Sequence, residues 1–344
     1  MSEPAAPPLL VVRDLVATFA TSRGPLTAVD GVSFELSAGT TLGIVGESGS
    51  GKSALVRSIM NILAPNGEVA ATSEIHIAGR DVRRMTRREQ TRFWGVEVSM
   101  IFQDPNTSLN PVKKVGRHIT EVTRWHLGLS RSDARTHAID LLAQVGIPEP
   151  QARFDQYPHQ LSGGMRQRAG IAAALACNPR LLIADEPTTA LDVTVQKQIL
   201  DLLRQLQQER DMGMILISHD LGAVAQYTDE VAVMYAGQIV ESCATDALYH
   251  ATRHPYTAAL LRSIPRPTSG ERQRLDVIPG QPPNLMIPLA GCRFRARCDR
   301  AQDRCATEEP QLVSHGDHHA ARCHFPIEEP ATGAARTSEQ DTTI

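Results

Sequence analysis

The chain reads LGIVGESGSGKS over residues 42–53, an apolar segment that runs straight into a glycine-rich turn. Residues 39–45 predict a buried strand, and the spacing after the turn predicts a helix that opens at Ser53. The turn fits the pattern G-x-x-x-x-G-K-[ST], which is typical of loops that hold phosphate groups between a strand and a helix. The order of strand, glycine turn and helix indicates an α/β fold with a phosphate-binding loop.

This loop supplies backbone donors and two side chains with distinct tasks. Its glycines allow conformations that turn successive N–H groups toward phosphate oxygens at a helix N-terminus. Lys52 is expected to reach the β- and γ-phosphates of a nucleotide, and Ser53 is expected to ligate Mg²⁺. The expected nucleotide contacts of the loop are Gly46, Ser48, Gly49, Ser50, Gly51, Lys52 and Ser53.

A second apolar strand ends in two carboxylates. Residues 181–184 read LLIA and are followed by Asp185 and Glu186. Both acids are therefore expected at the carboxyl edge of a parallel sheet, where ligands gather. Asp185 would hold Mg²⁺, usually through water, and Glu186 would polarise the water that attacks the γ-phosphate. Together with the glycine loop, the pair predicts a site that hydrolyses ATP.

The order of strand and helix patterns divides the chain. Residues 1–254 form the main domain, in which residues 9–19 and 31–36 predict strands and residues about 104–164 read as a helical insertion. Strand and helix then alternate again, with strands expected at 181–184, 214–217 and 231–235 and a helix at 195–209. Pro-rich sequence beyond residue 254 predicts a small appended module over residues 255–330. Residues 331–344 lack periodicity and are expected to be disordered.

Composition narrows the function classes. The chain has 344 residues, 42% of them hydrophobic, so it is long enough for one large or two modest domains. Its formal net charge of -3 gives no general attraction for nucleic acid or anionic lipid. No apolar run reaches the roughly 18 residues that a membrane helix needs, and the N-terminus lacks the pattern of a secretory signal. We therefore expect a cytosolic chain that spans no bilayer and binds no nucleic acid.

The segment LSGGMRQR at residues 161–168 lies between the glycine loop and the carboxylate strand. In this position it is a hallmark of ATP-binding cassette ATPases, and the chain resembles that family over nearly its whole length. The resemblance implies a P-loop NTPase core of the RecA-like type, with an antiparallel β subdomain and a helical insertion. It also implies that Ser162, Gly163 and Gly164 bind the γ-phosphate held by an opposite subunit, so that one chain supplies half of each site.

Three further residues match elements of that family, and a fourth, Phe19, is a candidate contact of the nucleotide base. Gln103, in MIFQDP, resembles the residue that senses Mg²⁺ and the attacking water, and Asp192 resembles part of the loop that crosses the dimer. His219, in ISHD, follows a strand, as does the family histidine that contacts the γ-phosphate and orients water and Glu186. Phe19 is expected to stack on adenine, although it could equally fill the core of its own strand.

The C-terminal quarter narrows the resemblance. Residues 254–261 and 278–283 look like the extension found on the ATPases of dipeptide, oligopeptide and nickel importers. Some members of that group hold a [4Fe-4S] cluster with a similar cysteine set. The resemblance carries this cluster over to Cys292, Cys298, Cys305 and Cys323.

The cysteine residues themselves leave the metal open. Four thiolates suit an iron–sulfur cluster or tetrahedral zinc, and the neighbouring arginines would offset the charge of an anionic cluster. Zinc sites favour C-x2-C pairs, which are absent from this window, but nearby histidines could act as substitute ligands; these are His315, His318, His319 and His324. Thiols that stay reduced or form disulfides are the third alternative.

These observations predict an ATPase subunit that powers the import of di- or oligopeptides from the cytoplasmic face of the cell membrane. The expected cofactors are ATP, Mg²⁺ and a [4Fe-4S] cluster. The expected partners are a second identical or homologous ATPase subunit, two transmembrane permease subunits and an external substrate-binding protein. Import of nickel or another small solute is one alternative, and a soluble cassette ATPase with redox regulation is another.

Overall fold

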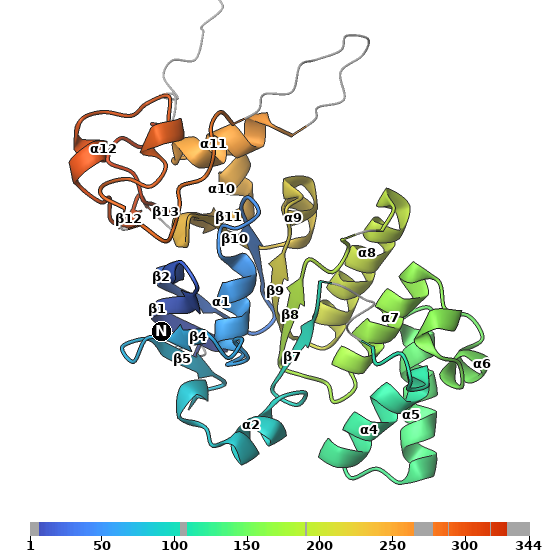
Figure 1. Ribbon diagram of the computed structural model, residues 1–344. Helices are drawn as coiled ribbons and strands as arrows, with labels where there is room; N and C mark the ends of the chain where they lie inside the picture. The colour runs from blue at the N-terminus through green and yellow to red at the C-terminus, as the bar shows by residue number, and fades with distance from the viewer. Residues whose placement is uncertain are drawn as a thin grey trace, which may run out of the picture.

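The computed structural model describes residues 7–103, 109–189, 191–264, 278–287, 289–316 and 318–328. Residues 104–108, where the helical insertion is expected to begin, and the expected disordered tail at 331–344 lie outside them. The described chain forms two β-sheets, helices that cover them, and a C-terminal module at the top of Figure 1. No helix in this part of the chain is long and apolar enough to cross a bilayer.

The larger sheet has its strands in the order β12-β13-β11-β10-β3-β9-β8-β7. The strands from β10 to β7 run parallel, and the remaining ones are antiparallel to their neighbours. Every residue of β3, β8 and β9 is buried, as expected of parallel strands that are covered on both faces. The bounds are β3 (Thr41–Val45), β7 (Val98–Ile101), β8 (Leu181–Asp185), β9 (Gly213–Ile217), β10 (Glu230–Tyr235), β11 (Gln238–Ala244), β12 (Val313–Ser314) and β13 (Ala320–Ala321).

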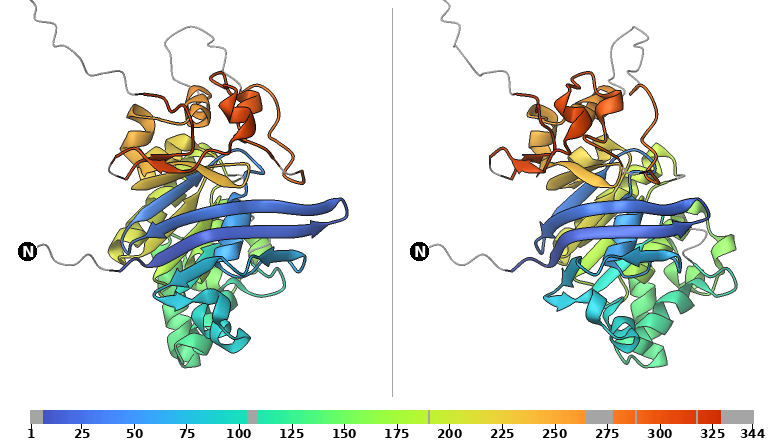
Figure 2. Two further views of the ribbon diagram at one scale, coloured as in Figure 1. Left: turned by 90° about the vertical axis from the view of Figure 1, so that its left-hand side faces the viewer. Right: turned by 60° about the vertical axis from the view of Figure 1, so that its left-hand side comes forward.

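The smaller sheet is antiparallel, in the order β2-β1-β5-β6, with β4 paired to the far end of β1. Strands β1 and β2 form a long hairpin, drawn in dark blue in both views of Figure 2. The second strand begins at Gly24 rather than at the expected Gly31. A Gly-Pro pair at 24–25 argues against a strand, but β2 lies at the sheet edge, where proline is tolerated. The bounds are β1 (Leu10–Thr21), β2 (Gly24–Leu36), β4 (Gly67–Val69), β5 (Glu74–Ile77) and β6 (Arg80–Asp81).

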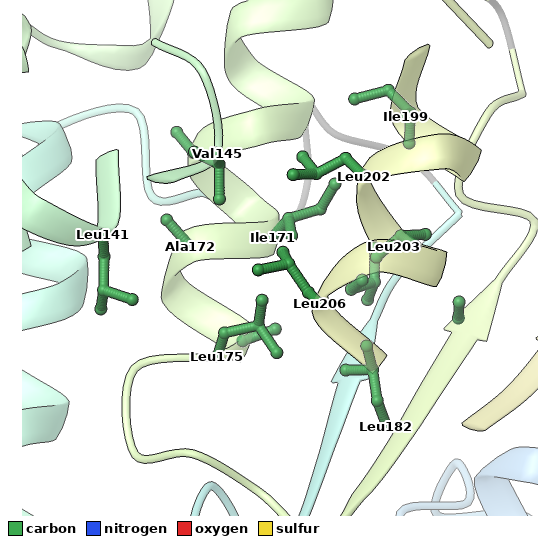
Figure 3. Close-up of a cluster of buried hydrophobic side chains, with 14 of the residues drawn as sticks. Leu141, Val145, Ile171, Ala172, Leu175, Leu182, Ile199, Leu202, Leu203 and Leu206 are labelled. Carbon is green, nitrogen blue, oxygen red and sulfur yellow. The ribbon is translucent and has the colours of Figure 1, made fainter. Parts of the chain in front are cut away.

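Alternate residues of the central strands face two hydrophobic cores, because side chains of a strand point to opposite sides. Leu182 of β8 packs with the helices α7 (Gly163–Ala174) and α8 (Val193–Glu209), as Figure 3 shows. Ile183, the next residue, packs in the core that contains α1 (Lys52–Ile59) and the antiparallel sheet. The parallel strands thus hold the helix after the phosphate loop in a fixed position.

The expected helical insertion, residues about 104–164, contains α4, α5 and α6, and α7 begins at its end; these helices are drawn in green in Figure 1. Leu141 of α5 and Val145, the C-cap residue of that helix, pack in the same hydrophobic cluster as Leu206 of α8. The insertion and α8 therefore share one core. The bounds are α4 (Val115–His126), α5 (Arg131–Gln144) and α6 (Pro150–Phe154), followed by a 3-10 turn at Pro158–Gln160. Outside the insertion, the main domain also contains α2 (Arg87–Phe93), α9 (Leu221–Tyr227) and a 3-10 turn at Val82–Arg84. The expected α/β fold is confirmed.

The C-terminal module is joined to the rest of the chain by both a strand and a core. Strand β13 pairs with β11 and so extends the large sheet. The rings of Tyr256 and Phe294 lie 4.5 and 5.3 Å from that of Tyr235 in β10, the strand beside β3. The helix α10 (Thr245–His250) precedes the module, which contains α11 (Pro255–Arg262), a 3-10 turn at Arg295–Arg297 and α12 (Arg304–Thr307). Its core therefore borders the strand that leads into the phosphate loop.

Candidate active site

The expected nucleotide residues lie along one edge of the large sheet. The phosphate loop follows β3, Gln103 follows β7, Glu186 follows β8 and His219 follows β9. These parallel strands are neighbours in the order β3-β9-β8-β7. Their carboxyl ends therefore bring together residues that are far apart in the sequence, at the edge where ligands bind in such sheets.

The glycines of the phosphate loop are required by its conformation. The φ values are 150° at Gly46, 78° at Gly49 and 106° at Gly51, and residues other than glycine rarely adopt such values. A Cβ atom on Gly46 would lie 2.1 Å from the carbonyl oxygen of Met234, and one on Gly51 would lie 2.3 Å from that of Ala28. The loop is thus pressed against neighbouring backbone, and Gly51 is the N-cap residue of α1.

The side chains of the loop are arranged for an anion. Lys52 is buried, and its Nζ donates to the carbonyl oxygens of Gly46 at 2.7 Å and Glu47 at 3.0 Å. Burial lowers the pKa of Lys52, while the carboxylates of Glu186, Asp185 and Glu47 oppose that shift. The hydroxyl of Ser50 is buried with no hydrogen-bond partner among the described residues, which leaves it available to a phosphate oxygen.

Ser53 and Asp185 form a site that fits Mg²⁺. The hydroxyl of Ser53 donates a 3.1 Å hydrogen bond to Oδ1 of Asp185. Asp185 is fully buried, and burial raises the pKa of its carboxyl group. Its other oxygen, Oδ2, is buried without a hydrogen-bond partner in the described chain. A buried and unpaired carboxylate oxygen is costly, and a divalent cation with oxygen ligands would satisfy it.

Glu186 is held by three side chains on a single oxygen. Its Oε2 accepts hydrogen bonds from Gln103 Nε2 at 2.9 Å and from Thr189 Oγ1 at 3.0 Å. Nδ1 of His219 lies 3.7 Å from the same oxygen. The side chain of Glu186 is 16% exposed and that of His219 is 68% exposed, so the carboxylate is sheltered while the imidazole is open to a ligand. This arrangement suits a carboxylate that orients and deprotonates water.

Nothing in the sequence pattern singles out Thr189. The signal that could have found it is its spacing, because a hydroxyl three residues after Glu186 can reach back across the turn that follows β8. The structure shows this contact, together with a backbone hydrogen bond from Thr189 N–H to the carbonyl of Glu186.

The segment 162–164 and Asp192 lie at helix N-termini, away from the phosphate loop. Ser162 is the N-cap of α7 and accepts a 3.3 Å hydrogen bond from the N–H of Met165, and Gly163 and Gly164 open that helix. Asp192 is the N-cap of α8 and accepts a 3.0 Å hydrogen bond from Val195. Among the described residues, no hydrogen bond or ion pair joins either to residues 46–53.

Phe19, the expected adenine contact, lies in β1 of the antiparallel sheet. It is partly buried, and a Cβ on Gly67 of β4 would lie 2.7 Å from its ring. In the β1–β2 ladder Phe19 is opposite Leu26. Leu26 lines a cavity with residues 47–50 of the phosphate loop. Because opposite residues share a sheet face, Phe19 lies on the same face of the antiparallel sheet as Leu26.

Comparison with known proteins assigns the family. The profile described as "ABC transporter" matches residues 29–189, and that described as "Oligopeptide/dipeptide transporter, C-terminal region" matches residues 240–305. The chain is 48% identical over 321 residues to the dipeptide transport ATP-binding protein DppD of Escherichia coli, which covers 93% of this chain and 98% of that protein. The chain belongs to the ABC transporter family. It is also 49% identical over 311 residues to the oligopeptide transport ATP-binding protein OppD of Bacillus subtilis, over 90% of this chain and 87% of that one.

Solved structures of the ABC family share the fold. The dimeric structure of the cassette MJ0796 superposes with a TM-score of 0.62 at 25% identity, over 69% of this chain and 98% of that one. The structure of cbiO1 from Clostridium perfringens gives a TM-score of 0.60 at 26% identity, over 72% and 92%. The ABC cassette thus accounts for about two thirds of this chain.

The four clustered cysteines of this ABC protein line one cavity. Cys292, Cys298, Cys305 and Cys323 are all free thiols there, and two arginines of the module, Arg295 and Arg300, line it as well. Burial raises the pKa of three of these thiols, that of Cys323 to about 11. Among the described residues no three His, Cys, Asp or Glu side chains are grouped so as to hold a metal ion.

Proposed function

We propose that this chain is the ATP-hydrolysing subunit of an importer of di- and oligopeptides. The observation that carries the hydrolytic part is the convergence of Gln103, Thr189 and His219 on one oxygen of Glu186. The peptide class is supported by the match of residues 240–305 to the oligopeptide/dipeptide transporter profile and by relatives that are named for dipeptide and oligopeptide transport. Nickel or another small solute is the alternative cargo.

The proposed reaction uses the residues at the sheet edge as follows. Backbone N–H groups of residues 46–53 and the ammonium of Lys52 bind the β- and γ-phosphates of ATP. Ser53, Asp185 and Gln103 would hold Mg²⁺, which when bound would offset the negative charge of those phosphates. Glu186 accepts the proton of the attacking water, and His219 contacts the γ-phosphate and keeps water and Glu186 in line. The base of the nucleotide would stack on Phe19.

The site is proposed to be completed by a second ATPase subunit, identical or homologous. Among the described residues, no hydrogen bond joins the segment 162–164 to the phosphate loop. This segment forms the N-terminus of α7, and a helix N-terminus suits an anion. Val193, directly after Asp192, is 82% exposed, as expected of a residue that packs against a partner. The related cassette MJ0796 is described as dimeric.

Two permease subunits are proposed to dock on the helical insertion, residues about 104–164, which is called the helical subdomain below. A groove there is lined by residues of its loops, of α4 and of α6, among them Val112, Arg117, Phe154 and Tyr157. Val112 is 79% exposed and Tyr157 is 37% exposed, and Phe102, next to Gln103, is 41% exposed. Exposed apolar side chains beside basic ones favour a protein partner over open solvent. The chain would then sit peripherally on the cytoplasmic face of the membrane, and an external substrate-binding protein would deliver the peptide.

A [4Fe-4S] cluster is proposed for the four cysteines. Its support is that all four thiols line one cavity beside two arginines, which suits an anionic cluster. Tetrahedral zinc is the alternative, since four thiolates suit either group. Among the described residues no three candidate ligands are grouped so as to hold a metal ion, and this holds for both alternatives. Iron and sulfide analysis of anaerobically purified protein, with a visible spectrum, tests the proposal. Iron-free, colourless and folded protein would exclude the cluster.

The transport function is tested with the complex purified together with its membrane partners and placed in liposomes. We expect ATP-driven uptake of a labelled dipeptide, and no uptake with Glu186→Gln. Uptake of Ni²⁺ in place of peptide would assign the alternative cargo. Full ATPase activity of a chain that never co-purifies with membrane proteins would favour a soluble ATPase with redox regulation.

A further inference from the structure

The C-terminal module reaches the phosphate-binding loop directly. Arg297 ends the 3-10 turn at Arg295–Arg297, and its side chain is only 4% exposed. Its two terminal nitrogens donate to the two carboxylate oxygens of Glu47, at 2.7 and 2.9 Å. The two residues are 250 positions apart in the chain. A bidentate pair of this kind fixes both distance and orientation.

Arg297 is itself fixed by its surroundings. Its Nε donates a 2.9 Å hydrogen bond to the carbonyl oxygen of Pro279, and its guanidinium lies 5.8 Å from the ring centroid of Tyr235. The edge of the planar guanidinium is therefore fixed by hydrogen bonds, and its face is fixed by the ring of Tyr235. An arginine held in this way can position a partner more rigidly than a flexible surface side chain.

Glu47 is held at three points, and the last of them is Lys52 of the phosphate loop. The Glu47 carboxylate binds Arg297, its N–H donates a 2.9 Å hydrogen bond to the hydroxyl of Tyr256, and its carbonyl accepts from Lys52. Arg297 and Tyr256 both belong to the extension beyond residue 254. The module thus contacts both the side chain and the backbone of Glu47, the second residue of the phosphate loop.

The charge of Glu47 makes this contact matter for ATP. A carboxylate in a loop that binds a triphosphate repels its ligand. The charge of Glu47 also acts on Lys52, where it opposes the lowering of the pKa by burial. The guanidinium of Arg297 offsets that charge at hydrogen-bond distance. Without Arg297, the buried side of the loop would keep an uncompensated negative charge.

We propose that Arg297 is a positioning residue for ATP binding, which neutralises and orients Glu47 and so keeps the phosphate loop ready for the triphosphate. The inference rests on the proposed ATPase function and deepens it, because it gives the C-terminal module a part in nucleotide affinity. The effect is on binding, so it acts on ground state and transition state alike. Loss of such uniform binding raises KM and leaves kcat nearly unchanged.

The test compares Arg297→Gln, Arg297→Lys and Arg293→Gln in the complex purified with its membrane partners. Arg293 is a matched control, since it is another nearly buried arginine of the module and ties it to Asp30 and to the carbonyl of Ala236, not to the phosphate loop. For Arg297→Gln we expect a KM for ATP raised on the order of tenfold, with kcat within about twofold. Arg297→Lys should give a smaller rise and Arg293→Gln none. An unchanged KM, or an equal rise in Arg293→Gln, would overturn the proposal.

A second substitution separates charge compensation from loss of packing. In the double variant Arg297→Gln with Glu47→Gln, the uncompensated carboxylate is gone, so KM should return to within about threefold of the wild type. A KM that stays raised contradicts the proposal. If Arg297→Gln fails to assemble, Arg297→Lys decides, because it keeps the charge but not the bidentate geometry; a wild-type KM there would overturn the inference.

Binding of ATP to Glu186→Gln, with and without Arg297→Gln, is measured by equilibrium fluorescence with a labelled nucleotide. We expect the same order of loss in affinity as in KM. This measurement needs no hydrolysis. A chain that binds ATP with an affinity set by Arg297 but never hydrolyses it would therefore contradict the proposed function and leave the positioning role intact.

Discussion

The side-chain amide of Gln103 donates a 2.9 Å hydrogen bond to Oε2 of Glu186, across the ends of the neighbouring parallel strands β7 and β8. The hydroxyl of Thr189 donates to the same oxygen. Within the described residues, hydrogen bonds to this carboxylate use Oε2 alone, which leaves Oε1 to accept a proton. The carboxylate of Glu186 is therefore oriented by Gln103, which directly precedes the helical subdomain on which the permease is proposed to dock.

Replacement of Glu186 by glutamine should separate binding from hydrolysis. An amide keeps the size of the side chain but cannot accept the proton of the attacking water, so phosphate release at saturating ATP should fall by about 10² to 10⁴. Equilibrium ATP binding should persist. Glu230→Gln, at the exposed start of β10, is the matched control and should leave both unchanged. Wild-type turnover in Glu186→Gln would remove this residue from its role.

Substitution of Ser162 should distinguish a helix cap from a nucleotide contact. Asparagine and aspartate are both good N-caps for α7, so Ser162→Asn and Ser162→Asp should both melt close to the wild type. Only aspartate adds a negative charge where the γ-phosphate of the facing subunit is proposed to bind. We expect ATP hydrolysis and ATP-dependent dimerisation to fall at least about tenfold in Ser162→Asp relative to Ser162→Asn. Equal activity of the two variants would place this serine outside the nucleotide site.

A charge on the helical subdomain should weaken permease docking. Val112 is exposed and lines the groove there, so Val112→Glu should sharply lower the amount of permease that co-purifies, without a change in melting temperature. Val313, in β12 on the C-terminal module, is also exposed and serves as the control position for the same substitution. Equal co-purification of Val112→Glu and Val313→Glu would move the docking face elsewhere.

His118 should make the stability of the subdomain sensitive to acid. Its Nε2 accepts from the N–H of Asn110 at 2.8 Å and its Nδ1 lies 3.1 Å from the carbonyl of Lys114, so one neutral tautomer satisfies both. Burial lowers the pKa of His118, and nearby Lys113 acts in the same direction while Glu121 opposes it. The unfolded chain therefore binds the proton more readily than the folded one. Stability from this group is present above pH about 6.5 and is lost as the pH falls below it.

The acid effect is measured as the urea midpoint at pH 7.5 and at pH 5.5. His118→Gln keeps an acceptor near Asn110 but does not titrate, so its midpoint should change less over this interval. His126 also has a pKa lowered by burial and stays as a background in both proteins. His159→Gln, at the 3-10 turn Pro158–Gln160, is the control and should behave like the wild type. The same acid sensitivity in His118→Gln would show that another group is responsible.

Local spacing was enough to predict the phosphate loop and the carboxylate strand, because each lies within about ten residues and its chemistry depends on backbone geometry near by. The glycines at 46, 49 and 51 do adopt the left-handed conformations that the pattern requires. By contrast, the sequence predicts only residues 31–36 of β2, whereas the strand extends over Gly24–Leu36. The Gly-Pro pair at 24–25 weakens a strand signal, and only the edge position of β2 makes it tolerable.

By itself, the sequence determined which residue types stand at the strand ends and helix starts, since those depend on spacing along a few turns of chain. The tertiary structure alone decided that Ser53 meets Asp185, that Gln103 and Thr189 share one oxygen of Glu186, and that Arg297 holds Glu47. The reason is physical: sheet order and core packing bring these groups within hydrogen-bond distance, and neither leaves a period or a motif in the sequence.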